Sequence, residues 1–154
     1  MRVKTERDAT KSGNDSKGFS VPCDRRRILV VEDEANVRAL FGQMISLHLS
    51  ECHIDVAVNG AEAVEEFRVS HHGVIVMDLF MPVMDGQAAF VEISKLCQAE
   101  NIEMPSVVFC TGHEPPVSLH GLISDNPAHC VLRKPMSKEL LMSTLKERLS
   151  AERN

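Results

Sequence analysis

The chain has 154 residues, a formal net charge of −5 and 44% hydrophobic residues. This length suits one domain, and the composition is typical of a globular protein rather than a disordered one. The longest apolar runs, at residues 28–31 and 74–77, are far shorter than the roughly 20 residues of a membrane span. No apolar stretch typical of a secretory signal occurs at the start of the chain. We therefore expect a cytoplasmic protein without a membrane span.

Basic residues are concentrated near the start of the chain, and the remainder is acidic. We interpret residues 1–26 as a flexible basic and polar extension, residues 27–150 as the folded domain and residues 151–154 as a C-terminal tail. A basic segment on an acidic body is able to bind nucleic acid, but charges of both signs are mixed in this one. We expect a solvated leader and no direct DNA binding.

From residue 27 onward, short apolar runs alternate with longer segments in which apolar residues recur every three or four positions. Runs of the first kind are typical of strands and segments of the second kind of helices. Their alternation is typical of a parallel sheet covered by helices. The expected strands are residues 28–31, 54–58, 74–77, 105–110 and 130–133.

The segments between these runs predict helices with one apolar face. Pro115, Pro116 and Pro127 leave room only for a short fourth helix near residues 117–124. Ser137 is expected to cap the last helix. The apolar side chains that we expect to face the sheet are Val37, Leu40, Phe41, Met44, Ile45, Val64, Phe67, Phe90, Ile93, Cys97, Leu140, Leu141, Leu145 and Leu149.

Polar side chains follow the apolar runs at the ends where parallel sheets gather ligand chemistry. Glu32 and Asp33 follow the first run, and Asp78 ends the third. Thr111 follows the fourth run, and Lys134 follows the fifth. Three carboxylates in one crevice repel one another unless a cation is bound. The set therefore predicts a site for a hard divalent ion, Mg²⁺ or Mn²⁺.

The same set suits phosphoryl transfer to a carboxylate. A carboxylate accepts a phosphoryl group when positive charge surrounds the transferred oxygens. Lys134 and the metal ion would supply that charge, and the Thr111 hydroxyl would hydrogen-bond a phosphoryl oxygen after transfer. We therefore expect an aspartyl phosphate at this edge of the sheet.

Several motifs in order resemble the receiver domain of bacterial response regulators, over about residues 27–149. They are ILVVED at 28–33, NGAEA at 59–63, VMDLFMPVMDG at 76–86, then Thr111 and Lys134-Pro135. The resemblance implies a flavodoxin-like (βα)5 fold, an α/β arrangement of three layers around a doubly wound parallel sheet of strand order 2-1-3-4-5. It also implies a two-component signalling protein rather than an enzyme.

The resemblance assigns the phosphoryl group to Asp78, with a sensor histidine kinase or a His phosphotransfer domain as the donor. It assigns the metal ion to Glu32, Asp33 and Asp78, together with the backbone carbonyl of Phe80. It makes Thr111 the switch hydroxyl and Lys134 the phosphate contact.

The resemblance also implies a cis peptide bond before Pro135. At the position of Val131, the family usually has a Tyr or Phe ring that turns inward on phosphorylation, so the usual output route is in doubt. Gly112 stands where Ala is common, which leaves access to the phosphate open. Phe80 and His113 occupy positions at which family members tune the loss of phosphate, and we expect the bulk of Phe80 to shield it.

The last helix ends close to the end of the chain, so we expect a stand-alone receiver that acts by phosphorylation-controlled binding of an unknown protein target. The alternative within the class is a receiver module of a hybrid kinase or phosphorelay. A haloacid-dehalogenase-like phosphatase would need an Asp in place of Phe80. A flavodoxin-like nucleotide binder would need a Gly-rich or hydroxyl-rich loop in place of Glu32-Asp33. Adjacent His71 and His72 show no metal-ligand spacing and are expected at the surface.

Overall fold

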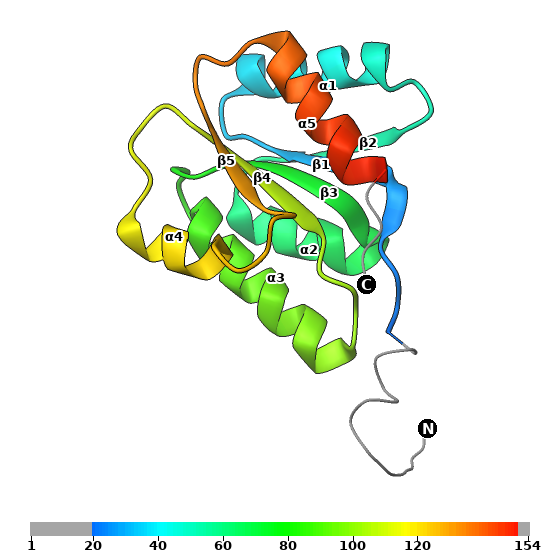
Figure 1. Ribbon diagram of the computed structural model, residues 1–154, viewed down its shortest axis with the longest axis vertical. Coiled ribbons are helices and arrows are strands. Elements are labelled where there is room, and N and C mark those ends of the chain that lie inside the picture. The colour runs from blue at the N-terminus through cyan, green and yellow to red at the C-terminus, as the bar shows by residue number, and fades with distance from the viewer. Residues whose placement is uncertain (1–19, 151–154) are drawn as a thin grey trace, which may run out of the picture.

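The computed structural model describes residues 20–150, in which five strands and five helices alternate (Figure 1). The strands are β1 Asp24–Val31, β2 His53–Ala57, β3 His72–Asp78, β4 Ser106–Thr111 and β5 Cys130–Arg133. The helices are α1 Ala35–His48, α2 Gly60–Ser70, α3 Gly86–Glu100, α4 Val117–Ile123 and α5 Lys138–Ser150. Residues 1–19 of the predicted extension and residues 151–154 of the predicted tail lie outside the described part of the chain.

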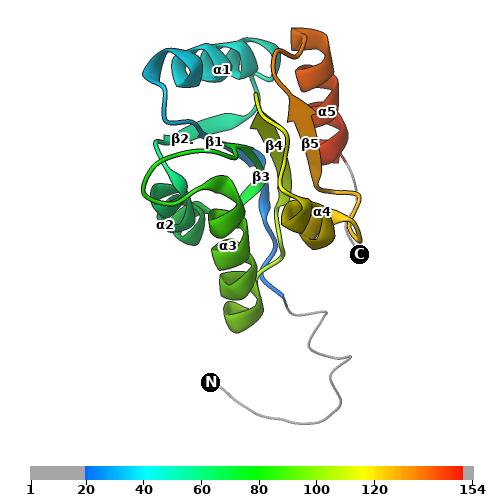
Figure 2. The same cartoon turned by 90° about the vertical axis from the view of Figure 1, so that its left-hand side faces the viewer.

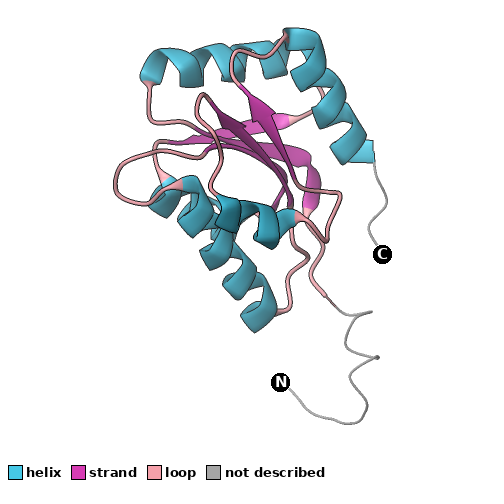
Figure 3. Cartoon of the chain, turned by 60° about the vertical axis from the view of Figure 1, so that its left-hand side comes forward, coloured by secondary structure: helices cyan, strands magenta, loops and turns pink. Residues whose placement is uncertain are grey.

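The strands form one parallel sheet of order β2-β1-β3-β4-β5. Helices α1 and α5 cover one face of the sheet, and α2, α3 and α4 cover the other (Figure 2). Colouring by secondary structure shows the strands as the middle of three layers (Figure 3). The predicted flavodoxin-like fold and strand order are confirmed. Within residues 20–150, no helix is both long and apolar enough to cross a membrane.

The two faces of the sheet carry separate apolar cores. Along β1, Leu29 and Val31 belong to the core under α2 and α3, whereas Ile28 and Val30 belong to the core under α1 and α5. The central strand β3 is buried over residues 72–77. Because both faces of this sheet are covered, its central strands read as continuous apolar runs rather than as an alternating pattern.

The loop between β3 and α3 is fixed at both ends. The Asp85 side chain caps α3 by accepting a hydrogen bond from the Ala88 N–H at 2.8 Å. The next residue, Gly86, has no room for a side chain, because a Cβ there would lie 2.4 Å from the backbone oxygen of Asp78. This close approach sets the start of α3 directly against the end of β3 and so positions Asp78.

The N-terminal boundary of the folded domain lies earlier than the sequence indicates. Strand β1 begins at Asp24, and Val21 forms a parallel bridge with Ile102. Cys23 is buried, and its thiol donates to the backbone oxygen of Glu103 at 3.0 Å. Residues 20–26 are therefore packed on the domain, so the expectation of a flexible segment is wrong for this stretch.

Some burial predictions also need correction. His72, expected at the surface, is completely buried, and its Nε2 lies 2.7 Å from Oδ2 of Asp55. Leu40 and Leu140, expected to face the sheet, are 56% and 45% exposed. The short fourth helix is confirmed, as is the Ser137 cap, which accepts from the Leu140 N–H at 3.0 Å.

Candidate functional site

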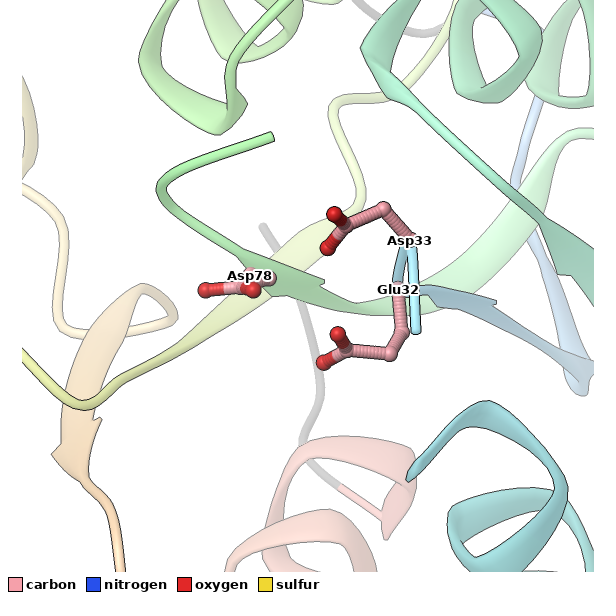
Figure 4. Close-up of side chains that lie close together, drawn as sticks. All are labelled: Glu32, Asp33 and Asp78. Carbon is pink, nitrogen blue, oxygen red and sulfur yellow. The ribbon is translucent and has the colours of Figure 1, made fainter. Parts of the chain in front are cut away.

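Three carboxylates meet at the carboxyl edge of the sheet. Glu32 and Asp33 follow the last residue of β1, and Asp78 is the last residue of β3. One oxygen from each carboxylate lies within 4.8 Å of the other two. In Figure 4 the side chains of Glu32 and Asp33 extend from the end of β1 toward the side on which Asp78 lies. The structure thus brings together the acidic residues that the sequence analysis singled out.

Burial sets the electrostatics of this cluster. The side chains of Glu32 and Asp78 are only 3% and 13% exposed. Burial raises the pKa of both carboxyl groups above their ordinary values, and their mutual repulsion adds to the rise for Glu32. The N–H groups of Leu79 and Phe80 act in the opposite direction, because they hydrogen-bond the Asp78 carboxylate. Because the pKa values of Glu32 and Asp78 are raised, a bound cation would stabilise their ionised forms.

Lys134 supplies positive charge beside these carboxylates. Its Nζ lies 3.1 Å from Oε1 of Glu32 and 3.8 Å from Oδ2 of Asp78. Burial disfavours the ammonium form, but the hydrogen bond to Glu32 and the charge of Asp78 outweigh it and raise the pKa of Lys134. The Lys134-Pro135 peptide bond is cis, as the family resemblance implies.

Thr111 lies at the same edge, with its hydroxyl engaged in its own loop. The Thr111 Oγ1 accepts a hydrogen bond from the His113 N–H at 3.1 Å and donates one to the His113 carbonyl at 3.2 Å. The residue is completely buried. In this state the hydroxyl is committed to His113 rather than to the carboxylates.

Two aromatic rings are in contact beside the site. The rings of Phe80 and His113 pack edge to face, with centroids 5.5 Å apart and planes at 86°. Gly112 lies next to His113, and a Cβ added there would meet nothing within 4 Å. Val131 packs against the core under α2 and α3, so an aliphatic side chain occupies the place of the family ring.

Arg38, on the first turns of α1, belongs to the site although its sequence position does not predict it. One of its guanidinium nitrogens donates to the backbone oxygen of Glu32 at 2.8 Å and to that of Asp33 at 3.5 Å. It therefore holds the backbone of the acidic turn without pairing with either carboxylate. An arginine a few residues after an acidic pair is common on helix surfaces, so the sequence alone carries no signal for this contact.

The arrangement fits a hard divalent cation. Within residues 20–150, the acidic cluster is the one group of three or more His, Cys, Asp or Glu side chains whose ligand atoms lie close enough to share an ion. All of its ligands are oxygens, which Mg²⁺ and Mn²⁺ prefer. The backbone carbonyl of Phe80 as an additional ligand stays a prediction.

A parallel sheet of this strand order, with three clustered carboxylates and a lysine at its carboxyl edge, defines a receiver domain. The chain belongs to the response regulator receiver domain family, whose model matches residues 28–146.

Curated relatives share part of this chain. A protein-glutamate methylesterase/protein-glutamine glutaminase of Aliivibrio fischeri is 41% identical over 81 residues, which are 53% of this chain and 22% of that protein. A probable transcriptional regulator, ycf27, of Cyanophora paradoxa is 32% identical over 72 residues, or 47% of this chain and 29% of that protein. The chain thus spans well under half the length of these relatives.

Solved structures share the fold. The receiver domain of a sensor histidine kinase from Pseudomonas aeruginosa, with magnesium coordinated in its active site cleft, has a TM-score of 0.66 at 23% identity. That match covers 82% of this chain and 98% of the other. The receiver domain of Ssk1 from Saccharomyces cerevisiae, crystallised with the histidine phosphotransfer protein Ypd1, has a TM-score of 0.67 at 24% identity, covering 79% and 86%.

Proposed function

We propose that the protein is a signalling phospho-acceptor that takes a phosphoryl group onto Asp78 from a phosphohistidine on a histidine kinase or a His phosphotransfer protein. The observation that carries the proposal is the meeting of three carboxylates within 4.8 Å of one another, with the Lys134 ammonium 3.8 Å from Asp78. A carboxylate that receives a phosphoryl group needs positive charge close by to neutralise the phosphoryl oxygens. Lys134 and a metal ion held by the carboxylates would supply that charge.

The acidic cluster also supports a dependence on Mg²⁺ or Mn²⁺. Glu32, Asp33 and Asp78, with the backbone carbonyl of Phe80, would hold the ion. When bound, the ion neutralises charge on the carboxylates and on the phosphoryl oxygens. A metal-bound receiver domain of the same fold, from the Pseudomonas sensor kinase, supports this assignment.

The chain's own residues would perform the transfer. A carboxylate oxygen of Asp78 forms the new bond to phosphorus while the bond from phosphorus to the donor imidazole nitrogen breaks. The N–H groups of Leu79 and Phe80 hold the carboxylate in place, and Lys134 balances the incoming charge. The Thr111 hydroxyl then has a new acceptor, a phosphoryl oxygen, that competes with its partner in the loop.

Signalling would follow from phosphorylation-controlled binding of another protein. The complex of the Ssk1 receiver domain with Ypd1 shows a receiver of this fold bound to a histidine phosphotransfer protein. It supports a phosphohistidine protein as the donor partner. We propose no direct DNA contact for the described domain.

Intact-mass measurement tests the proposal. The wild-type chain, Asp78→Asn and Asp85→Asn are incubated with Mg²⁺ and acetyl phosphate, with EDTA in a parallel sample. Asp85→Asn is the matched control, because Asn also caps helices and Asp85 lies in the same loop. We expect one added phosphoryl group on the wild type and on Asp85→Asn with Mg²⁺, and none on Asp78→Asn or with EDTA. Equal uptake by Asp78→Asn would refute the proposal.

A further inference from the structure

The Thr111 hydroxyl is already in use in the unphosphorylated protein. It holds both the N–H and the carbonyl of His113, at 3.1 and 3.2 Å. A hydroxyl has one hydrogen to donate, so donation to a phosphoryl oxygen on Asp78 requires that the bond to the His113 carbonyl break. Recruitment of Thr111 therefore removes this restraint and leaves the backbone of His113 free to move.

The ring of His113 opposes that movement. It packs edge to face against Phe80, with the ring centroids 5.5 Å apart, and Phe80 follows Asp78 by two residues. The contact joins the loop after β3 to the loop after β4. An aromatic pair of this geometry stabilises a structure beyond the burial of its area. The loop that Thr111 releases when its hydroxyl turns is thus still attached, through the ring pair, to the loop that follows the phospho-acceptor.

The segment after His113 leads to the start of α4 and makes two side-chain contacts of its own. Ser118 exchanges hydrogen bonds with Gln87 at the start of α3, at 2.9 and 3.3 Å. Glu114 pairs with Arg133 at 2.9 Å, but both side chains are more than half exposed, so that pair adds little. Residues 114–116 join His113 directly to α4, so a displacement of His113 acts on the first turn of that helix.

We propose that the Phe80–His113 ring pair is a latch that holds the off state, and that its release carries the signal from Thr111 to the start of α4. This inference rests on the proposed function, since it concerns how a phosphoryl group on Asp78 is read. It also supplies an output route for a chain with Val131 in place of the family ring. The stability of the ring pair sets how much of the free energy of phosphoryl binding is needed to open the loop after β4.

A tryptophan at the start of α4 makes the opening measurable. The chain has no Trp and no Tyr, and Val117 is 84% exposed, so Val117→Trp provides a single emission signal. Beryllofluoride, a stable phosphoryl mimic, is titrated with Mg²⁺ into this reporter protein, and the midpoint of the emission change is recorded. Intact mass after acetyl phosphate is measured on the same protein.

Variants in the reporter background separate the ring contact from general effects. We expect His113→Ala to move the midpoint to about two- to tenfold lower beryllofluoride, the range that corresponds to one aromatic pair. His113→Phe keeps an aromatic ring and should restore the midpoint. Val83→Ala trims another exposed apolar side chain of the Asp78 loop, 82% exposed, and should leave the midpoint of the reporter protein unchanged.

A second entry into the pair makes the test independent of any one variant. Phe80→Leu keeps bulk without a ring and should shift the midpoint as His113→Ala does, while the double variant should shift it no further. Additive shifts, unshifted midpoints or a silent reporter on a protein that gains phosphate would overturn the latch and leave the proposed function standing. A reporter protein that neither responds nor gains phosphate would overturn both.

Discussion

Removal of the Asp78 charge should stabilise the metal-free protein, although it abolishes the proposed phosphorylation. At an effective dielectric constant of about 20, Glu32 and Asp78 repel each other by about 3 kcal/mol at the 4.8 Å that bounds their oxygen separation. Lys134 attracts Asp78 by about 4 kcal/mol at 3.8 Å. These two contributions nearly cancel, so only the hydrogen bonds from the Leu79 and Phe80 N–H groups offset the cost of burying the carboxylate, and the pKa of Asp78 stays raised.

The direction of the raised pKa agrees with this balance. The folded protein holds the Asp78 proton more tightly than the unfolded chain does, so folding becomes less favourable as the pH rises through that range. The whole cost is present once the carboxyl group is ionised in both the folded and the unfolded state. We therefore expect Asp78→Asn to raise the free energy of unfolding by about 1 to 2 kcal/mol, the usual size of a single-substitution effect.

Urea unfolding followed by circular dichroism measures the difference in the free energy of unfolding between the wild type and the variant. One series contains EDTA, and the other contains about 10 mM Mg²⁺, an excess that should saturate the site. In EDTA, Asp78→Asn should be the more stable protein. Mg²⁺ should stabilise the wild type more than the variant, because a ligand that binds only the folded state adds to its stability. An Asn variant that is less stable than the wild type in EDTA would refute the reasoning, and Asp85→Asn should stay within about 0.5 kcal/mol of the wild type.

Other substitutions test the frame of the site and the core. Gly86→Ala should lower the free energy of unfolding in urea by about 2 to 3 kcal/mol, because its Cβ would lie 2.4 Å from a backbone oxygen. Gly112→Ala has open space around its Cβ and should change the free energy of unfolding by less than about 0.5 kcal/mol. Equal losses in the two variants would contradict this reasoning. Burial lowers the pKa of His72 below 6.5, and its Nδ1 has no hydrogen-bond partner among residues 20–150. Wild-type stability should therefore fall as the pH drops below that value. In His72→Leu, the free energy of unfolding should fall less steeply between about pH 7.5 and pH 5, the range in which His titrates. An unchanged pH dependence of stability would exclude His72 as the cause. Phe67→Ala should cost about 3 to 5 kcal/mol in thermal or urea unfolding, since the ring is completely buried; a loss below about 1 kcal/mol would show that the core readily collapses around the gap.

Much of the fold could be predicted because its pattern is local. The apolar runs that became β1, β3 and β4 are covered on both faces, so the sequence shows them without interruption. The acidic residues of the site follow these runs directly, and the strand ends of a parallel sheet share one edge. Placing Glu32, Asp33 and Asp78 together therefore required no knowledge of side-chain geometry.

The features that were misplaced depend on contacts between distant residues. His72 is buried because Asp55, on a strand that is not its neighbour in the sheet, accepts its ring N–H at 2.7 Å. Strand periodicity cannot reveal such a partner. Leu140 lies in the first turn of α5, where a small rotation of the helix decides whether a side chain faces the sheet or solvent, and it is 45% exposed.

Residues 20–27, which pack on the domain through β1 and the segment after α3, matter for any shortened form of the protein. The family match begins at residue 28, inside β1, but Arg27 pairs in register with His53, and Asp24 pairs with His72. A chain trimmed to the family boundary would lose half of a central strand and expose the buried His72 and the backbone of Glu103. Expression trials should therefore retain residues from at least Ser20 onward.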